Sequence, residues 1–93
     1  MQQSVIDEAA QRIERMESRF DALLEAESTN PAAIRKDAVL REYLRILTQY
    51  YENGQWLQDY ELDEKGLLPK ALKRGVLSQD AVYDFLGRIK PVG

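Results

Sequence analysis

Hydrophobic residues recur every three or four positions through the first part of the chain, and charged residues fill the positions between them. This spacing is typical of one face of an amphipathic α-helix. The pattern predicts a first helix over residues 4–27, with Ser4 as its N-cap. Packing of this helix within the chain is the preferred interpretation, because an intermolecular coiled coil needs at least three or four heptads.

A second helix is predicted from Pro31 to about Glu52. Asn30 is expected to be its N-cap, and proline is tolerated at the first helical position because its missing N–H is not needed there. Asn53 and Gly54 are expected to end the helix, since glycine readily adopts the left-handed conformation at a helix C-terminus. The hydrophobic stripe of this helix is broad, which predicts contact with more than one neighbour.

The pattern changes after Gly54. A short helix is predicted there, ended by Gly66 and prevented from continuing by Pro69. A last helix is expected to begin at Ser78 as N-cap. The predicted buried face of this last helix consists of Val82, Phe85, Leu86 and Ile89.

Together these elements predict an all-α fold in a single domain over residues 1–93. Residues 1–53 would form an antiparallel hairpin of two long amphipathic helices, because the connection between them is short. Residues 54–93 would form a C-terminal arm of short helices folded across the open face of the hairpin.

The composition narrows the possible chemistry. The chain has 93 residues with no Cys and no His, so disulfides, thiolate chemistry and Ser-His-Asp mechanisms are excluded within it. A zinc site would need carboxylates alone, against the usual preference for nitrogen and sulfur. We therefore expect no enzyme activity, no metal and no cofactor.

The N-terminal residues lack a basic stretch followed by an apolar run, and no apolar stretch approaches the roughly 20 residues that span a bilayer. We expect a cytoplasmic protein without membrane association. The net charge of −3 argues against non-specific nucleic-acid binding, although the C-terminal third is basic.

An acidic stretch contains Asp59, Glu61, Asp63 and Glu64. A calcium-binding EF-hand loop counted from Asp59 would need glycine at position 6 and glutamate at position 12, but glycine falls at position 8 and Lys70 at position 12. The template fails, and nothing selects one pair of carboxylates for general acid–base catalysis. A solvated acidic face or a set of helix caps is the preferred interpretation.

Lys70, Lys73 and Arg74 form a basic cluster in the sequence. One interpretation is a contact with an anion or phosphate, although no glycine-rich strand-to-helix loop supports it. The preferred interpretation is ion pairing with the acidic stretch just upstream.

Aromatic residues are concentrated around the end of the second helix. Core packing is the default interpretation, and a recognition surface is the alternative, since Tyr and Trp dominate interaction hot spots. The group consists of Tyr43, Tyr50, Tyr51, Trp56 and Tyr60.

Residues 50–86 contain a tyrosine pair, a Gly-x-Trp turn, an Asp-Tyr-x-x-Asp-Glu stretch and a Leu-Pro-x-x-Leu-Lys-Arg-Gly-Val-Leu-Ser run. This combination resembles the signature of a small bacterial family, the domain of unknown function number 4298. The resemblance covers about 40% of the chain, and the N-terminal half resembles the family only in being amphipathic helix. It implies a bacterial, cytoplasmic protein and supplies no activity.

The leading hypothesis is a non-catalytic protein-interaction module that binds another protein or a second copy of itself. The alternative is an anion- or nucleic-acid-binding regulator that uses the basic cluster. The candidate binding residues are Tyr51, Trp56, Asp59, Tyr60, Asp63, Glu64, Lys70, Lys73 and Arg74.

Overall fold

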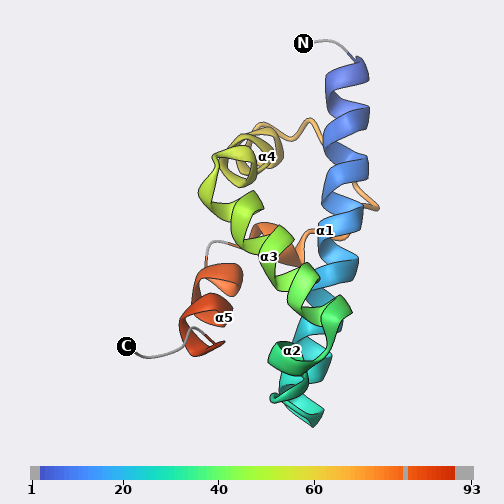
Figure 1. The fold of residues 1–93 in the computed structure, drawn as a ribbon. Helices are drawn as coiled ribbons and strands as arrows, with labels where there is room; N and C mark the ends of the chain where they lie inside the picture. The colour runs from blue at the N-terminus through green and yellow to red at the C-terminus, as the bar shows by residue number, and fades with distance from the viewer. Residues whose placement is uncertain (1–2, 79, 90–93) are drawn as a thin grey trace.

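The computed structural model describes residues 3–78 and 80–89, and every regular element among them is a helix (Figure 1). The predicted all-α fold is confirmed. The elements are α1 (Gln3–Thr29), α2 (Ala33–Lys36), α3 (Ala38–Glu52), α4 (Gln55–Glu64), the 3-10 helix η1 (Gly75–Leu77) and α5 (Ala81–Ile89).

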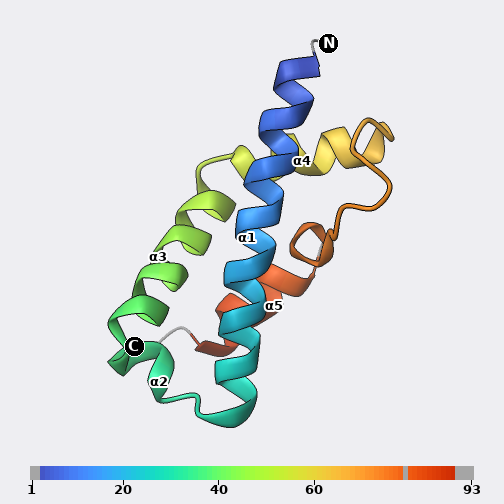
Figure 2. The same ribbon diagram turned by 90° about the vertical axis from the view of Figure 1, so that its right-hand side faces the viewer.

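Helices α1 and α3 run side by side in opposite directions and form the predicted hairpin (Figures 1 and 2). Helix α1 contacts α2, α3, α4 and η1, so it is the element around which the others are arranged. Its buried stripe follows the helical period that the sequence shows. The hydrophobic members of that stripe are Ala9, Ile13, Met16, Phe20, Leu23 and Ala26.

The second predicted helix is interrupted, which corrects the prediction of one helix up to Glu52. Helix α2 ends at Lys36, and Asp37 has an extended backbone with φ −82° and ψ 127° before α3 begins. The Asp37 carboxylate accepts hydrogen bonds from the N–H groups of Val39 at 2.9 Å and Leu40 at 3.0 Å. It is therefore the N-cap of α3. Hydrophobic periodicity continues across this break, so the period alone did not reveal it.

The start of the second helix was also predicted too early. Helix α1 continues to Thr29, and Asn30 and Pro31 lie in the turn that follows. The carbonyl oxygen of Asn30 accepts a hydrogen bond from the N–H of Ala33 at 2.9 Å, whereas the residue that precedes α2 is Ala32. The turn residues were thus correctly recognised as a break, but Asn30 is not the N-cap.

The predicted ends at Gly54 and Gly66 are confirmed, since both have positive φ, 95° and 70° respectively. The predicted start of the last helix at Ser78 is wrong, because α5 begins at Ala81. Ser78 instead closes η1, with its N–H donating to the carbonyl oxygen of Gly75 at 3.1 Å.

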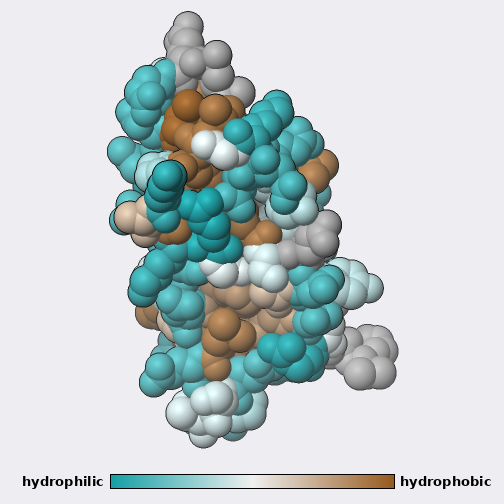
Figure 3. Space-filling view, turned by 180° about the vertical axis from the view of Figure 1, so that it is seen from behind, coloured by the Kyte–Doolittle hydropathy of each residue, from teal (hydrophilic) through white to brown (hydrophobic). Residues whose placement is uncertain are grey.

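One hydrophobic core joins the hairpin to the arm. Phe20 of α1 and Phe85 of α5 meet edge to face, with ring centroids 5.6 Å apart. Helix α3 contacts α1, α2 and α4, in agreement with its broad hydrophobic stripe. Seen from behind, the surface is largely hydrophilic, with hydrophobic areas near the N-terminal end and in the lower half (Figure 3). In the described part of the chain, none of the helices has the length and hydrophobicity needed to cross a membrane.

Candidate functional site

The acidic residue Asp59 is buried, not on a solvated face. Its side chain is 0% exposed and accepts hydrogen bonds from Nε and Nη2 of Arg12, at 2.9 and 2.5 Å, and from the hydroxyl of Tyr50 at 2.7 Å. Arg12 comes from α1, Tyr50 from α3 and Asp59 from α4. These three residues, which we call the buried triad, therefore tie three helices together.

The electrostatics of the buried triad favour a fixed protonation state. The hydrogen bond to Asp59 raises the pKa of the Arg12 guanidinium above its ordinary value. Burial, and then the hydrogen bond to Asp59, raise the pKa of the Tyr50 phenol far above its ordinary value. Tyr50 thus remains a proton donor to the carboxylate, and a buried carboxylate is tolerated because it is paired and hydrogen-bonded.

A second set of contacts holds the chain where η1 begins. Nε1 of Trp56 donates to the carbonyl oxygen of Val76 at 2.8 Å, and Oε2 of Glu17 accepts from the N–H of Val76 at 3.2 Å. Both backbone polar groups of Val76 are therefore satisfied by side chains, one from α4 and one from α1. The preceding residue, Gly75, lies so close to the Glu17 side chain that a Cβ on it would be 2.8 Å from Oε1 of Glu17. A Cβ at this position would displace the Glu17 carboxylate that accepts from the N–H of Val76.

Arg74 fixes the segment between α4 and η1 through contacts with α4 and with the backbone of the segment. Its guanidinium forms an ion pair with Asp63 and donates to the carbonyl oxygen of Pro69 at 2.6 Å. Nε donates to the carbonyl oxygen of Leu72 at 3.2 Å. An ion pair between the basic cluster and the upstream acidic stretch is thus present, but it joins Arg74 to Asp63, while Asp59 pairs with Arg12 in α1.

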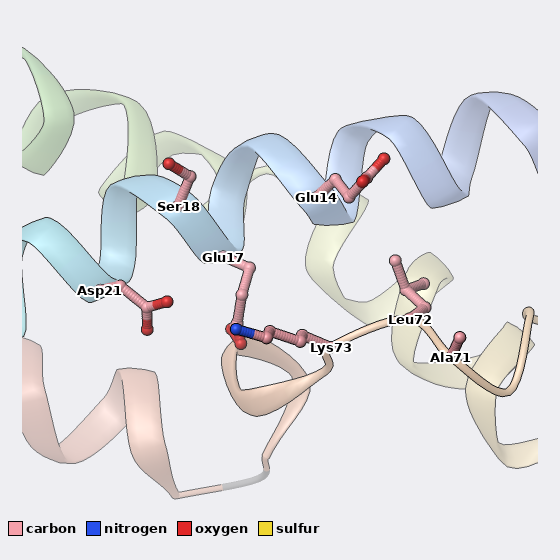
Figure 4. Close-up of a pocket in the computed structure, with 7 residues that line it drawn as sticks. All are labelled: Glu14, Glu17, Ser18, Asp21, Ala71, Leu72 and Lys73. Atoms are coloured by element: carbon pink, nitrogen blue, oxygen red, sulfur yellow. The ribbon is translucent and has the colours of Figure 1, made fainter.

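The basic cluster does not present one common surface. Lys70 is exposed in the segment after α4, whereas the side chain of Lys73 extends toward Glu17 of α1 (Figure 4). Lys73 lines a hollow of about 450 Å³ in which α1 contributes most of the polar groups. The lining residues are Glu14, Glu17, Ser18, Asp21, Ala71, Leu72 and Lys73.

The aromatic residues near the end of α3 are brought together. Trp56 stacks on Tyr60 with ring centroids 5.1 Å apart, and Tyr51 contacts Trp56 edge to face at 5.3 Å. Trp56 is buried, while Tyr51 and Tyr60 are partly buried. This arrangement joins α3 to α4 and turns part of the aromatic group toward the core.

Tyr51 also borders a second hollow of about 380 Å³, between the end of α3 and α5. We call this the aromatic hollow; its lining is Tyr51, Glu52, Tyr83, Leu86 and Gly87. The Tyr83 side chain is 64% exposed there. Sequence reasoning missed Tyr83, although it falls outside the predicted buried face of the last helix, which is the signal that could have identified it.

Helix α5 is anchored to the hairpin by charged groups. Arg88 forms a two-pronged ion pair with Glu27, at 2.9 and 2.8 Å, and this contact holds the pKa of the Glu27 carboxyl below its ordinary value. Arg35 of α2 donates to the carbonyl oxygen of Ile89 at 2.7 Å. These contacts hold α5 beside the hairpin, where α5 forms one wall of the aromatic hollow.

The remaining predicted site residue, Glu64, is exposed at the last position of α4. Within residues 3–78 and 80–89, no three carboxylate, His or Cys side chains are grouped so that they could hold a metal ion. Most of the predicted site residues therefore serve internal contacts.

The structure is thus an all-α domain in which residues of the signature hold a C-terminal arm against a helical hairpin. The family described as "Domain of unknown function (DUF4298)" matches residues 13–92, and the chain belongs to it. The resemblance seen in the sequence is confirmed and extends well into α1. Neither the comparison with curated proteins nor the comparison with solved structures gives a match.

Proposed function

We propose that the chain is a non-catalytic protein-interaction module and that its partner binds at the aromatic hollow. The observation that supports this most is Tyr83, a large aromatic side chain that is 64% exposed beside Tyr51 and Leu86. Tyrosine is enriched in interaction hot spots because it offers a large apolar area together with a hydroxyl group. The hollow gives a partner side chain a place to insert.

In this proposal the signature residues act indirectly. Asp59 and Trp56 are buried, and Arg74 has three acceptors within the chain. Their role is to fix the position of α4 and η1 against the hairpin. A partner then recognises the surface that this framework supports.

We further propose that the chain is not an enzyme. The buried carboxylate of Asp59 already accepts three hydrogen bonds, and its neighbour Tyr50 is held protonated. A general base needs a proton of its substrate within hydrogen-bonding reach. A carboxylate that is 0% exposed offers no such access.

The test is site-specific photocrosslinking in cells of the native host. A photoreactive phenylalanine analogue at position 83 is expected to give a discrete crosslinked product, either with another protein or with a second copy of the chain. The matched control is position 39, since Val39 is 56% exposed at the opposite end of α3 from Tyr51. Mass spectrometry of the product separates a hetero-partner from self-association.

The proposal fails if position 83 gives no crosslinked product, or if positions 83 and 39 give the same products. Size-exclusion chromatography with light scattering tests self-association independently. A monomer at every concentration would leave only a hetero-partner.

The alternative, an anion- or nucleic-acid-binding regulator, has less support. Arg74 is engaged with Asp63, and Lys73 lies beside three carboxylates of α1, which oppose the approach of a phosphate. The variant pair Lys70→Glu and Lys73→Glu tests it without breaking the Arg74 ion pair. A salt-dependent affinity for nucleic acid that is lost in this double variant would establish the alternative instead.

A further inference from the structure

We propose that Asn53 is a site of spontaneous chemical modification, at which its side-chain amide is converted into aspartate and isoaspartate through a cyclic imide. This inference goes beyond the proposed function and does not depend on it. Asn53 is exposed between α3 and α4 and is followed by Gly54. The reaction requires attack by the backbone nitrogen of the following residue on the side-chain amide carbon.

Features of this corner favour the attack once the turn opens. Oδ1 of Asn53 accepts a hydrogen bond from the N–H of Gln55 at 2.9 Å, so the negative charge that develops on this oxygen is stabilised. In the described part of the chain, no backbone carbonyl accepts from the N–H of Gly54, which leaves this nitrogen available. Apart from the adjacent residues of the chain, no atom lies within 4 Å of the place where a Cβ of Gly54 would be, so the space on that side of Gly54 is open.

The balanced steps are as follows. The nitrogen of Gly54 forms a bond to Cγ of Asn53, the bond from Cγ to Nδ2 breaks, and ammonia leaves with the proton that Gly54 loses. Water then adds to one of the two imide carbonyl groups. Opening of the ring at Cγ gives aspartate, and opening at the backbone carbonyl gives isoaspartate, so one water is consumed and one ammonia is released.

The ring cannot close in the resting conformation. The ψ angle of Asn53 is 1°, so its Cα–C bond must rotate, and the turn must open for that moment. We therefore expect the reaction to be slower in the folded chain than in the unfolded chain. It still proceeds in the folded chain, because Gly54 has no side chain to oppose the rotation.

Isoaspartate at this position would disturb the corner between α3 and α4. It inserts one additional carbon atom into the backbone at a point that the Tyr51–Trp56 contact spans. The contact between Tyr50 and Asp59 spans the same corner. Modification at Asn53 would therefore loosen both the aromatic contact and the buried triad.

The test incubates the folded full-length chain in mildly alkaline buffer at physiological temperature, and peptide mapping with mass spectrometry follows the products. We expect aspartate and isoaspartate to accumulate at position 53 and not at Asn30, the other asparagine, because Pro31 has no backbone N–H to attack with. The near-ultraviolet circular dichroism of Trp56 should fall in proportion to the isoaspartate formed. An Asn53→Gln variant, which would need a less favourable six-membered ring, should keep its signal.

Absence of product at position 53 in the folded chain would overturn the proposal, whether or not the urea-unfolded chain reacts. Equal product at Asn30 would also overturn it, since the Gly54 nitrogen could not be the cause. These readouts are independent of any partner, so they are separate from the test of the proposed function.

Discussion

Removing the carboxylate of Asp59 should destabilise the fold strongly. In Asp59→Ala, Arg12 loses its ion pair and the buried hydroxyl of Tyr50 loses its acceptor. Loss of one partner of a buried ion pair costs about 3–5 kcal/mol. The Arg12 side chain is 22% exposed, so water can partly hydrate the remaining charge. We therefore expect the free energy of unfolding to fall by about 3 kcal/mol.

This loss is large compared with the stability of a chain of this size. At about 0.05–0.15 kcal/mol per residue, 93 residues give a free energy of unfolding of roughly 5–14 kcal/mol. Asp59→Ala would therefore remove a fifth to more than half of it. Urea unfolding followed by far-ultraviolet circular dichroism measures the change, by linear extrapolation to zero denaturant.

The matched control is Glu61→Ala, at an exposed position of the same helix. It should change the free energy of unfolding by no more than about 0.5 kcal/mol. If Asp59→Ala behaves like Glu61→Ala, the buried triad is not the element that ties α1, α3 and α4 together, and the reasoning is refuted.

Two glycine substitutions should have opposite effects in the same urea assay. Gly75→Ala should lower the free energy of unfolding by about 1–3 kcal/mol, because the new Cβ displaces the Glu17 carboxylate from the buried N–H of Val76. Gly87→Ala lies in α5 with nothing within 4 Å of the new Cβ, and it should raise the free energy of unfolding by about 0.5–1 kcal/mol. Equal effects would contradict the close approach of Gly75 to Glu17. The raised pKa of Tyr50 means that the fold favours the neutral phenol, so its contribution is complete below the unfolded value of about 10 and is lost as the pH rises further. Tyr50→Phe should lower stability at neutral pH by about 1.5–3 kcal/mol and make the alkaline loss shallower, and an unchanged alkaline profile would show that Tyr50 is not responsible for it.

The sequence predicted the helices well where the signals are local. The stripe of α1 and the stops at Gly54 and Gly66 depend on residues close together in the chain, so periodicity and backbone preference were sufficient. The cap at Asp37 was missed although its signal is also local, because an uninterrupted hydrophobic period concealed it. Asn30 and Ser78 were assigned as caps from residue type alone. In the structure their backbone groups form turn hydrogen bonds instead, from Ala33 to Asn30 and from Ser78 to Gly75.

The candidate site was harder to predict because its contacts join distant residues. Asp59 was interpreted as part of a solvated face, since its partner Arg12 lies 47 positions away in the chain. The close neighbour of Gly75 is Glu17 in α1, far away in the chain, so no local pattern indicated this contact. The pairing of Arg74 with Asp63 was accessible because the two residues lie only 11 positions apart.

The most direct test of the account compares partner capture and stability in Tyr83→Ala. Because the Tyr83 side chain is 64% exposed, the free energy of unfolding of this variant should stay within about 0.5 kcal/mol of the value for the unsubstituted chain. The partner identified by crosslinking should no longer be captured by this variant from the native host, while Val39→Ala should capture it normally. Undiminished capture by a folded Tyr83→Ala variant would contradict the claim that the aromatic hollow is the partner-binding surface.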